Sequence, residues 1–544
     1  MNGLGCMGAL TPLASGATAS PEVVLFESLG SVLVLGDDAS VGDVAEVVAH
    51  NHRTVVFAPG IEARAFASHV TAVGRLVTAV RGHLGAFQAE VRSASGVSDI
   101  GAASPNPNRF FDMVLDLGQR PLWTSAVAPL GYFAPGEGAA ARAAAIESML
   151  ALVGRFTKPR YFSYQPDLCA HGASGLQGCT RCLEVCSAQA ITSAGNTIRV
   201  DPHLCQGCAT CTLACPTGAL SFKFPTREAL GKRLEQALSS HGAAKAVLMV
   251  HSSTLSEQAQ ASIDEHGALS FVVDLLPAFG EELWLRALAL GAGTLVLVAD
   301  EALSPKSRSA IESRVAEIHA MLPVLRMARE RLVWLQESAL PRWLDEYCAK
   351  QVAAAAQKDS DSVSTLGGQA SIPPASPTWA RYKRLAWIDD LRLLGSAAGA
   401  SATTELPADS SFGEVRVNPR RCTLCFACTN LCPTSALQAV NAKTQQLVFQ
   451  ESACVQCGLC VQGCPEKALS LHARFAPRTL AQMTCSVLHQ DEQLACTSCG
   501  SPFISRRLLA SSLERIKEHP QLTKGGRLAL MTCPACRQRE MLSL

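Results

Sequence analysis

The chain has 544 residues, 48% of them hydrophobic, and its 47 Lys and Arg residues nearly balance 46 Asp and Glu residues. A chain of this length is too long to fold around one hydrophobic core, so we expect roughly three to five domains. A formal net charge of +1 provides no field that would gather nucleic acid or an anionic membrane. The longest apolar run, 287–299, is too short to cross about 30 Å of hydrocarbon. We therefore expect neither a nucleic-acid partner nor a membrane span.

Residues 1–155 predict an α/β domain, because strand-like apolar runs alternate with a helical stretch. The first strand ends in Gly36-Asp37-Asp38, and no G-x-G-x-x-G follows any strand, so nothing predicts a pyrophosphate site. We expect a flavoprotein-like scaffold without the dinucleotide fingerprint, or a docking domain. The expected strands are 31–36, 54–58, a hairpin of 75–80 and 84–91 joined around Gly82, and 111–117.

Residues 227–340 predict a second α/β domain with a small parallel sheet. The expected strands, 246–250, 271–276 and 294–299, alternate with helical segments. Residues 341–410 are expected to hold a helix and a flexible linker. The linker is placed at 353–376, which is rich in Ala, Ser, Gln, Gly and Pro.

The cysteine content indicates metal binding. The chain has 23 cysteines but no Lys or Arg before the apolar residues of its N-terminus and no twin-arginine pair, so we expect no secretory signal and a cytoplasmic location. Cysteines in such a chain favour metal over disulfides. Most of them fall into four tight groups and two C-terminal CxxC pairs. Cys6, Cys348 and Cys485 stand alone.

Three of the groups follow C-x2-C-x2-C-x3-C and are followed by proline. A cubane needs four thiolates at tetrahedral corners, and ligands at every third residue of a short loop can hold three of them. The segments from Arg199 and from Arg416 align almost without gaps, which indicates duplication. The three regular groups are Cys205, Cys208, Cys211 and Cys215; Cys422, Cys425, Cys428 and Cys432; and Cys454, Cys457, Cys460 and Cys464.

The first group departs from this pattern. Nine residues separate Cys169 from Cys179, after which Cys182 and Cys186 resume the spacing, and Ser187 replaces the proline. Three glycines in the insert allow it to loop out and return Cys169 to the site, so we expect Cys169 to be a ligand. Zinc knuckles or buried free thiols are the alternative, but zinc sites use paired CxxC turns instead of such triplets.

These motifs resemble bacterial two-cluster ferredoxins twice over, in modules placed at 160–226 and 411–475. In that family the fourth cysteine of each motif serves the neighbouring cluster. The resemblance thus implies four 4Fe–4S clusters. Their ligand sets would be Cys169, Cys179, Cys182 and Cys215 (the Cys169 site); Cys205, Cys208, Cys211 and Cys186 (the Cys205 site); Cys422, Cys425, Cys428 and Cys464 (the Cys422 site); and Cys454, Cys457, Cys460 and Cys432 (the Cys454 site).

The tail, 476–544, resembles a zinc ribbon. Cys496 and Cys499 form one CxxC turn and Cys533 and Cys536 a second, and two such turns can complete a tetrahedron. Zinc is the preferred metal. A rubredoxin-like iron site is the alternative, since rubredoxins use similar turns.

Two further resemblances concern the α/β regions. The run from Gly74 is similar to a hairpin in the flavin-binding subunit of heterodisulfide reductases, whose flavin fingerprint is missing here. Residues 245–335 resemble the delta subunit of methyl-viologen-reducing hydrogenase, through the stretch from Asp274 to Asp300. That family places cysteines in this domain and this segment has none, so the resemblance implies the fold only.

Together these features predict a multidomain α/β and α+β protein: two ferredoxin-like dicluster modules, flanking small parallel-sheet domains and a zinc-ribbon-like tail. The expected function is electron relay between a dehydrogenase or reductase and another carrier, without catalysis by this chain alone. Its architecture resembles accessory polyferredoxins of molybdenum enzymes such as formate dehydrogenase, which would be the redox partner. The alternatives are a flavin- or NAD-linked oxidoreductase subunit and a redox-sensing or assembly scaffold.

Overall fold

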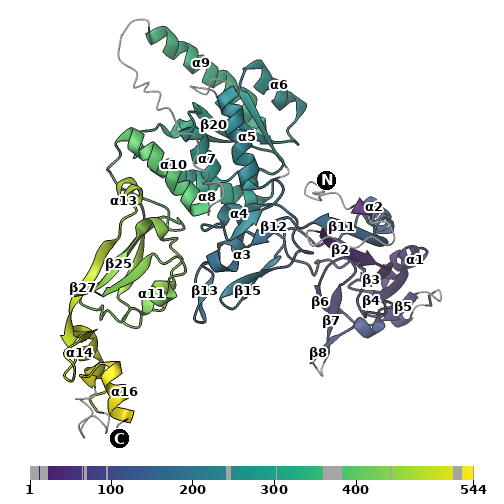
Figure 1. The fold of residues 1–544 in the computed structure, drawn as a ribbon. Coiled ribbons are helices and arrows are strands. Elements are labelled where there is room, and N and C mark those ends of the chain that lie inside the picture. Colours follow the sequence, from purple (N-terminus) through teal and green to yellow (C-terminus); the bar gives the residue numbers. More distant parts are fainter. Residues whose placement is uncertain are drawn as a thin grey trace. The chain divides into compact units, whose positions relative to one another are not determined.

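The structure is a computed structural model, and its contacts divide the chain into two compact units (Figure 1). The N-terminal unit comprises residues 1–162, 185–192 and 199–208. The C-terminal unit comprises residues 163–184, 193–198 and 209–544. The structure describes residues 11–12, 23–63, 65–66, 70–93, 96–240, 247–301, 303–358, 383–441, 444–518 and 530–542.

A parallel five-stranded sheet, in the order β10-β9-β3-β4-β5, organises the N-terminal unit. Every residue of β3 is buried, because both faces of the sheet are covered. Val32 and Val34 pack with helix α1, whereas Leu33 and Leu35 pack with strands of a second sheet. The elements are β3 (Ser31–Leu35), α1 (Gly42–Ala49), β4 (Arg53–Phe57), β5 (Val70–Val73), β9 (Met113–Asp116) and β10 (Tyr132–Phe133).

The second sheet confirms the predicted hairpin. Strands β6 and β7 pair antiparallel, and Gly82, just after β6, has a φ of +108° that favours glycine. A third strand, β8, which the sequence analysis did not identify, extends this sheet. A further antiparallel sheet has the order β1-β11-β2. The bounds are β1 (Thr11–Pro12), β2 (Val23–Ser28), β6 (Val77–Arg81), β7 (Gln88–Ser93), β8 (Gly96–Asp99), α2 (Ala139–Leu150) and β11 (Gly154–Pro159).

The parallel sheet predicted for the second α/β region is confirmed, with the order β19-β18-β20-β21. Strand β21 was not predicted, and β19 ends at Val273, earlier than expected, because a short 3-10 helix that contains Pro277 begins at Leu276. The bounds are α5 (Arg227–Ser240), β18 (Val247–Ser252), α6 (Glu257–Glu265), β19 (Leu269–Val273), α7 (Glu281–Ala289), β20 (Thr294–Ala299), α8 (Pro305–Met321) and β21 (Leu332–Gln336).

Two long helices follow this sheet. Helix α9 spans Leu340–Lys358, so the start of the predicted linker is helical instead, since its alanines are strong helix formers. The rest of that prediction lies outside the described residues. Helix α10 spans Lys383–Ala398 and buries Trp387 in the same core as Trp284 of α7.

The first cysteine field, residues 160–226, is built from short elements, among which β13 and β14 form a hairpin. Its elements are β12 (Phe162–Tyr164), β13 (Gly172–Ala173), β14 (Leu176–Gln177), α3 (Arg181–Val185), β15 (Ile191–Ala194), β16 (Thr197–Val200), α4 (Thr210–Ala214) and β17 (Leu220–Phe222).

The second cysteine field, residues 411–475, and the segments next to it form two antiparallel sheets, β22-β26-β23 and β24-β25-β27-β28. Strand β27 belongs to the tail but pairs with β25, so the tail continues the sheet of this field. Among the described residues, no helix has both the length and the apolar character needed to cross a bilayer. The bounds are β22 (Thr404–Glu405), β23 (Gly413–Val417), α11 (Ala427–Leu431), β24 (Leu437–Asn441), β25 (Thr444–Phe449), α12 (Leu459–Gln462), β26 (Leu469–Phe475), α13 (Pro477–Gln482), β27 (Ser486–Ala495), β28 (Pro502–Ser505), α14 (Arg506–Arg515) and α16 (Pro534–Leu542).

Candidate iron–sulfur sites

The three regular cysteine motifs share one backbone conformation. In each, the residues directly before and after the second cysteine have positive φ. Such left-handed residues turn successive amides toward one concave side, which is a recurrent way to hold anions and iron–sulfur clusters. The residues are Gly207 (+73°) and Ala209 (+60°), Leu424 (+57°) and Phe426 (+57°), and Gln456 (+54°) and Gly458 (+84°).

The amides of these turns contact the first cysteine of each motif. Burial raises the pKa of Cys205 and of Cys454 to about 11, and hydrogen bonds from the Gly207 and Gln456 amides act in the opposite direction. Cys422 has the same arrangement with the amide of Leu424. Each first thiol thus lies in an apolar environment that nevertheless provides a donor for a thiolate.

All four motifs share a second left-handed position, the third residue after the last cysteine. The residues are Gln189 (+51°), Gly218 (+80°), Ser435 (+53°) and Lys467 (+46°). The irregular motif that contains Cys169 therefore ends like the other three, although it lacks the two left-handed residues around its second cysteine.

The structure brings the four thiols of the Cys169 site together. They line one cavity with about 350 Å³ of unfilled volume, including the part open to solvent. Burial raises the pKa of Cys182, and the neighbouring thiols of Cys215, Cys179 and Cys169 raise it further. His171, fully buried, bonds the Cys179 carbonyl oxygen at 2.8 Å and Ser193 Oγ at 2.7 Å, so it packs beside the site.

The nine-residue insert of this motif forms the β13–β14 hairpin. Ser174 (φ +51°) and Gly175 (φ +78°) occupy its two-residue turn. The Cys179 amide donates to the Ala170 carbonyl oxygen at 2.9 Å, which closes the base of the hairpin. The hairpin therefore returns Cys179 to the vicinity of Cys169 in an ordered way, where a flexible loop had been expected.

The thiols of the Cys422 site also line a cavity with about 350 Å³ of unfilled volume. Burial raises the pKa of Cys428 to about 12, with further contributions from Cys422, Cys425 and Cys464. Cys464, from the other motif of this field, also accepts a hydrogen bond from the Ala468 amide at 3.3 Å. The structure thus groups three cysteines of one motif with the fourth of the next.

The Cys454 site shows the reciprocal grouping. Burial raises the pKa of Cys460, and the thiols of Cys454, Cys457 and Cys432 raise it further. The Gln456 side chain lies 3.4 Å from Cys454 Sγ. Cys432 therefore lies with the cysteines of the following motif, in the arrangement that the ferredoxin resemblance implies.

Three of the four expected ligands of the Cys205 site belong to the N-terminal unit. Cys186, Cys205 and Cys208 belong to the N-terminal unit, where burial raises the pKa of Cys186 and the Cys208 thiol adds to it. Cys211 belongs to the C-terminal unit. Within the N-terminal unit, Lys158 Nζ donates to the Cys205 carbonyl oxygen at 2.9 Å.

Buried cations beside the cysteine segments escaped the sequence analysis. Lys158 bonds the carbonyl oxygens of His203 and Cys205, Lys383 those of Thr212 and Leu213, and Arg384 those of Ser452 and Cys454. All three are nearly inaccessible. Each of these side chains bonds a segment that is far away in the sequence. No local sequence signal could therefore have identified it.

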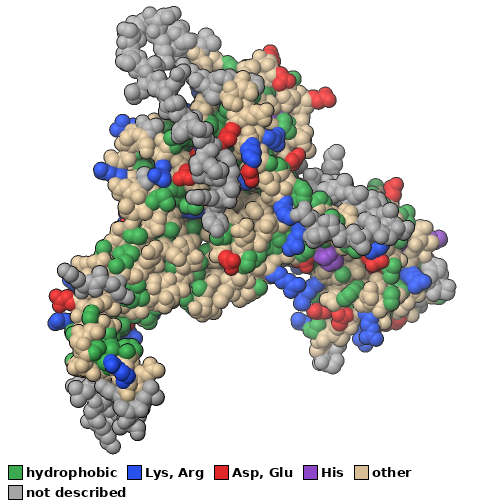
Figure 2. Space-filling view, in the orientation of Figure 1, with side chains coloured by type: hydrophobic (Ala, Val, Ile, Leu, Met, Phe, Trp, Pro, Cys, Tyr) green, Lys and Arg blue, Asp and Glu red, His purple; other side chains and the backbone are tan. Residues whose placement is uncertain are grey.

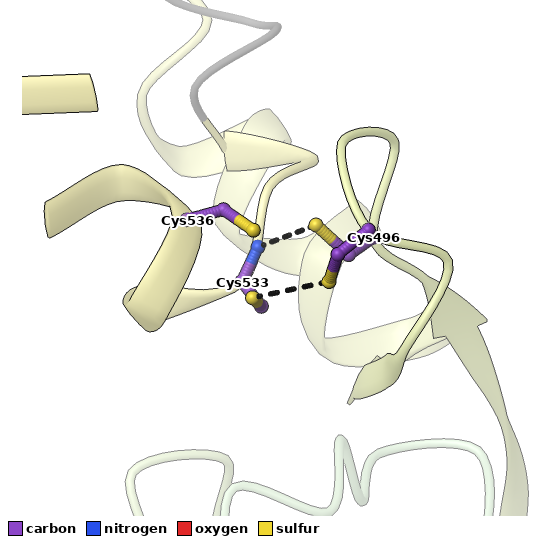
Figure 3. Close-up of side chains that lie close together, drawn as sticks. Cys496, Cys533 and Cys536 are labelled. Carbon is purple, nitrogen blue, oxygen red and sulfur yellow. Dashed lines mark hydrogen bonds between the residues drawn. The ribbon is translucent and has the colours of Figure 1, made fainter. Parts of the chain in front are cut away.

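The C-terminal pairs also meet. The four sulfur atoms of Cys496, Cys499, Cys533 and Cys536 lie within 4.8 Å of one another. The Cys533 amide donates to Cys496 Sγ at 3.1 Å, and Cys499 Sγ lies 3.8 Å from Cys533 Sγ. Figure 3 shows the labelled sulfur atoms turned toward one another. A tetrahedron of metal–sulfur bonds of about 2.3 Å separates sulfurs by about 3.8 Å, so this set fits one zinc or iron ion.

The isolated cysteines lie elsewhere. Cys348 is half-buried in α9 and Cys485 is exposed, whereas Cys6 lies outside the described residues. The Cys169, Cys422 and Cys454 sets, by contrast, fit clusters: in each set the thiols lie near one another, and burial raises the pKa of at least one of them. A bound 4Fe–4S cluster would accept and release single electrons at such a site.

Two segments match family models of iron–sulfur domains. Residues 421–469 match a 4Fe–4S dicluster domain, and residues 197–220 match a 4Fe–4S binding domain. The first match spans all eight cysteines of the second field. The second spans Cys205 to Cys215 and begins after the irregular motif.

A curated relative supports the same chemistry. Over 51 residues the chain is 45% identical to the "aliphatic sulfonate oxidoreductase, polyferredoxin-like subunit" of Pyrococcus furiosus. The match covers 9% of this chain and 29% of the relative. The chain thus contains ferredoxin-type 4Fe–4S domains within a mixed α/β fold.

Proposed function

We propose that the chain is an electron relay holding four 4Fe–4S clusters, two in each of the modules at 160–226 and 411–475. The Cys169, Cys205, Cys422 and Cys454 sites provide the sixteen ligands. The observation that carries this proposal is the convergence of cysteines from two motifs on each of the Cys169 and Cys422 cavities. Four thiols around one cavity meet the ligand requirement of a cubane.

The residues around these sites are suited to stabilise the extra negative charge of a reduced cluster. Reduction adds one negative charge, and hydrogen bonds to sulfur and burial are the protein's means of setting the potential. The inward amides of Gly207, Leu424 and Gln456 supply donors. The buried cations Lys158 and Arg384 supply positive charge beside the Cys205 and Cys454 carbonyl oxygens.

We propose that the tail binds a structural zinc through Cys496, Cys499, Cys533 and Cys536, with rubredoxin-like iron as the alternative. The four sulfurs lie close enough to share one ion. A zinc there would be redox-silent and would fix the turn that ends β27 against the turn before α16.

The proposed partners are redox proteins. The relative from Pyrococcus furiosus is described as a subunit of an oxidoreductase. By analogy, this chain would pass electrons to or from a catalytic subunit, for which we propose a molybdenum enzyme such as formate dehydrogenase. Figure 2 shows both acidic and basic side chains among the described residues of the visible face.

Anaerobic purification with metal analysis and EPR tests the proposal. We expect about sixteen iron atoms and as many sulfides per chain, with about one zinc. Dithionite should bleach the visible absorbance and produce spin-coupled signals, and a mild oxidant should reverse both changes. A colourless preparation with zinc in these sites would overturn it. Clusters that do not cycle would indicate a structural or sensing role instead.

A further inference from the structure

Two of the proposed cluster sites, one from each module, pack directly against each other within the C-terminal unit. Gly178 directly precedes Cys179, and a Cβ atom placed on it would lie 2.7 Å from Leu459 Cγ. Leu459 directly precedes Cys460. Gly463 repeats this closeness, because a Cβ there would lie 2.9 Å from Leu176 Cδ1 of the hairpin. A side chain at either position would force neighbouring atoms to shift, so the two glycines favour this close approach.

One cation of the first module bonds a residue that directly precedes the second module. Arg181, two residues after Cys179, donates from Nη2 to the Ser410 carbonyl oxygen at 2.9 Å. Burial raises the pKa of Cys179 to about 11, while Arg181 acts against it and Cys457 adds to it. Burial also raises the pKa of Cys457, again with Arg181 acting against it. The guanidinium therefore acts on a thiol of each module.

Helix α10 binds both sites through two consecutive residues at its start. Lys383 Nζ donates to the Leu213 carbonyl oxygen at 2.7 Å, in the segment that leads to Cys215. Arg384 Nη2 donates to the Cys454 carbonyl oxygen at 2.8 Å. Leu213, Trp387 and Phe412 belong to one hydrophobic core, so the contact between the modules is supported by packing on several sides.

We propose that the Cys169 and Cys454 sites form an inter-module electron junction at the close approach of Gly178 and Leu459, with Arg181 as the positioning cation. The proposal rests on the proposed function, since it requires cubanes at both sites. The step moves one electron from a reduced 4Fe–4S cluster at one site to an oxidised one at the other. No bond or proton moves. The two modules then exchange electrons directly instead of acting as two separate carriers.

The positive charge of Arg181 gives this junction a specific electrostatic property. A cation near two redox sites stabilises the more negative, reduced state of each. Because Arg181 acts on a thiol from both modules, its removal should lower both junction potentials together. Loss of a residue with a purely structural role would not shift the reduction potentials of two sites in the same direction.

The first experiment isolates the junction by EPR. The variant Cys208→Ser/Cys425→Ser disables the Cys205 and Cys422 sites and should retain about eight iron atoms. Fully reduced, it should show a signal broadened or split by spin coupling. Adding Cys460→Ser, or instead Cys182→Ser, should leave about four iron atoms and an uncoupled signal. If the eight-iron variant gives only the sum of the two single-site spectra, the junction is wrong while the cluster assignment stands.

The second experiment keeps all cysteines. In the full chain, Arg181→Gln should lower two of the four midpoint potentials, and Arg181→Lys should restore much of the shift. Arg416→Gln, at an exposed position, is the matched control and should leave all four unchanged. Equal potentials in Arg181→Gln and the wild-type chain would overturn the role of Arg181. Absence of cubanes from the wild-type chain would instead overturn the proposed function itself.

Discussion

At the scale of single residues, backbone conformation reveals a pattern that residue types conceal. Leu424, Phe426 and Gln456 have positive φ, which is uncommon for side chains of this size. The equivalent positions at 207 and 458 are glycines. The sequence shows no common residue type there, because the requirement falls on the backbone and its amides. The cysteine spacing therefore predicted the motifs but not the turns that direct their amides.

Replacing one cysteine should remove one cluster. Cys428→Ser or Cys460→Ser each removes a thiolate from a different proposed site, so each variant should contain about four fewer iron atoms per chain. Iron and sulfide analysis of anaerobic samples checks this. Cys485→Ser, at an exposed isolated cysteine, is the control and should keep the full content. An unchanged iron content in Cys428→Ser would contradict the assignment of the Cys422 site.

Arg384 is a second residue whose role depends on burial. Its side chain bonds the carbonyl oxygens of Ser452 and Cys454 and lies 3.8 Å from the centre of the Phe412 ring. Arg384→Met leaves two buried carbonyls without these donors, at a cost of about 1–3 kcal/mol each. The urea midpoint of anaerobic unfolding should fall accordingly. Arg384→Lys should recover part of the loss, and equal midpoints in Arg384→Met and wild type would refute this role.

At the scale of elements, the hairpin β13–β14 shows how an irregular motif remains compatible with a site. The expectation that its glycines make the insert flexible was incomplete, because Gly175 occupies a defined two-residue turn. The strands that were predicted from long apolar runs, such as β3 and β20, match closely because burial on both faces leaves a clear pattern. Short strands such as β8, which is exposed throughout, carry no such pattern.

The turn of this hairpin can be tested separately from the cysteines. Gly175 has a φ of +78°, and a Cβ there would meet no atom within 4 Å, so substitution perturbs only the backbone. Gly175→Val should cost about 1–2 kcal/mol and speed the loss of iron from the Cys169 site. Gly175→Asn should behave nearly as wild type, because asparagine tolerates this conformation. Iron retention over time checks both, and equal loss in the two variants would argue against the turn.

At the scale of the whole molecule, the tail continues a sheet of the second cysteine field. Strand β27 pairs with β25 and leads to Cys496, the first of the four C-terminal thiols. The tail's thiols are therefore held next to an iron–sulfur domain without belonging to its cysteine sets. Loss of their metal should leave those sets intact.

This separation predicts the effect of removing the tail metal. Cys536→Ser should reduce the metal content by about one ion per chain and leave the visible iron–sulfur absorbance unchanged. If zinc is the metal, the zinc content falls and the iron content per chain stays constant. If about one iron atom is lost instead, the rubredoxin-like alternative holds. Element-resolved mass spectrometry distinguishes these results. A marked decrease in iron–sulfur absorbance would show that the tail metal supports the second module.

The sequence alone determined the thiol motifs, their duplication and the parallel sheets, because cysteine spacing and long apolar runs are local signals. Only the tertiary structure decided which thiols share a cavity, which cations lie behind them and how closely Gly178 approaches Leu459. These features join residues far apart in the chain. They arise from packing around a shared core, and the free energy of that packing has no signature in any single segment.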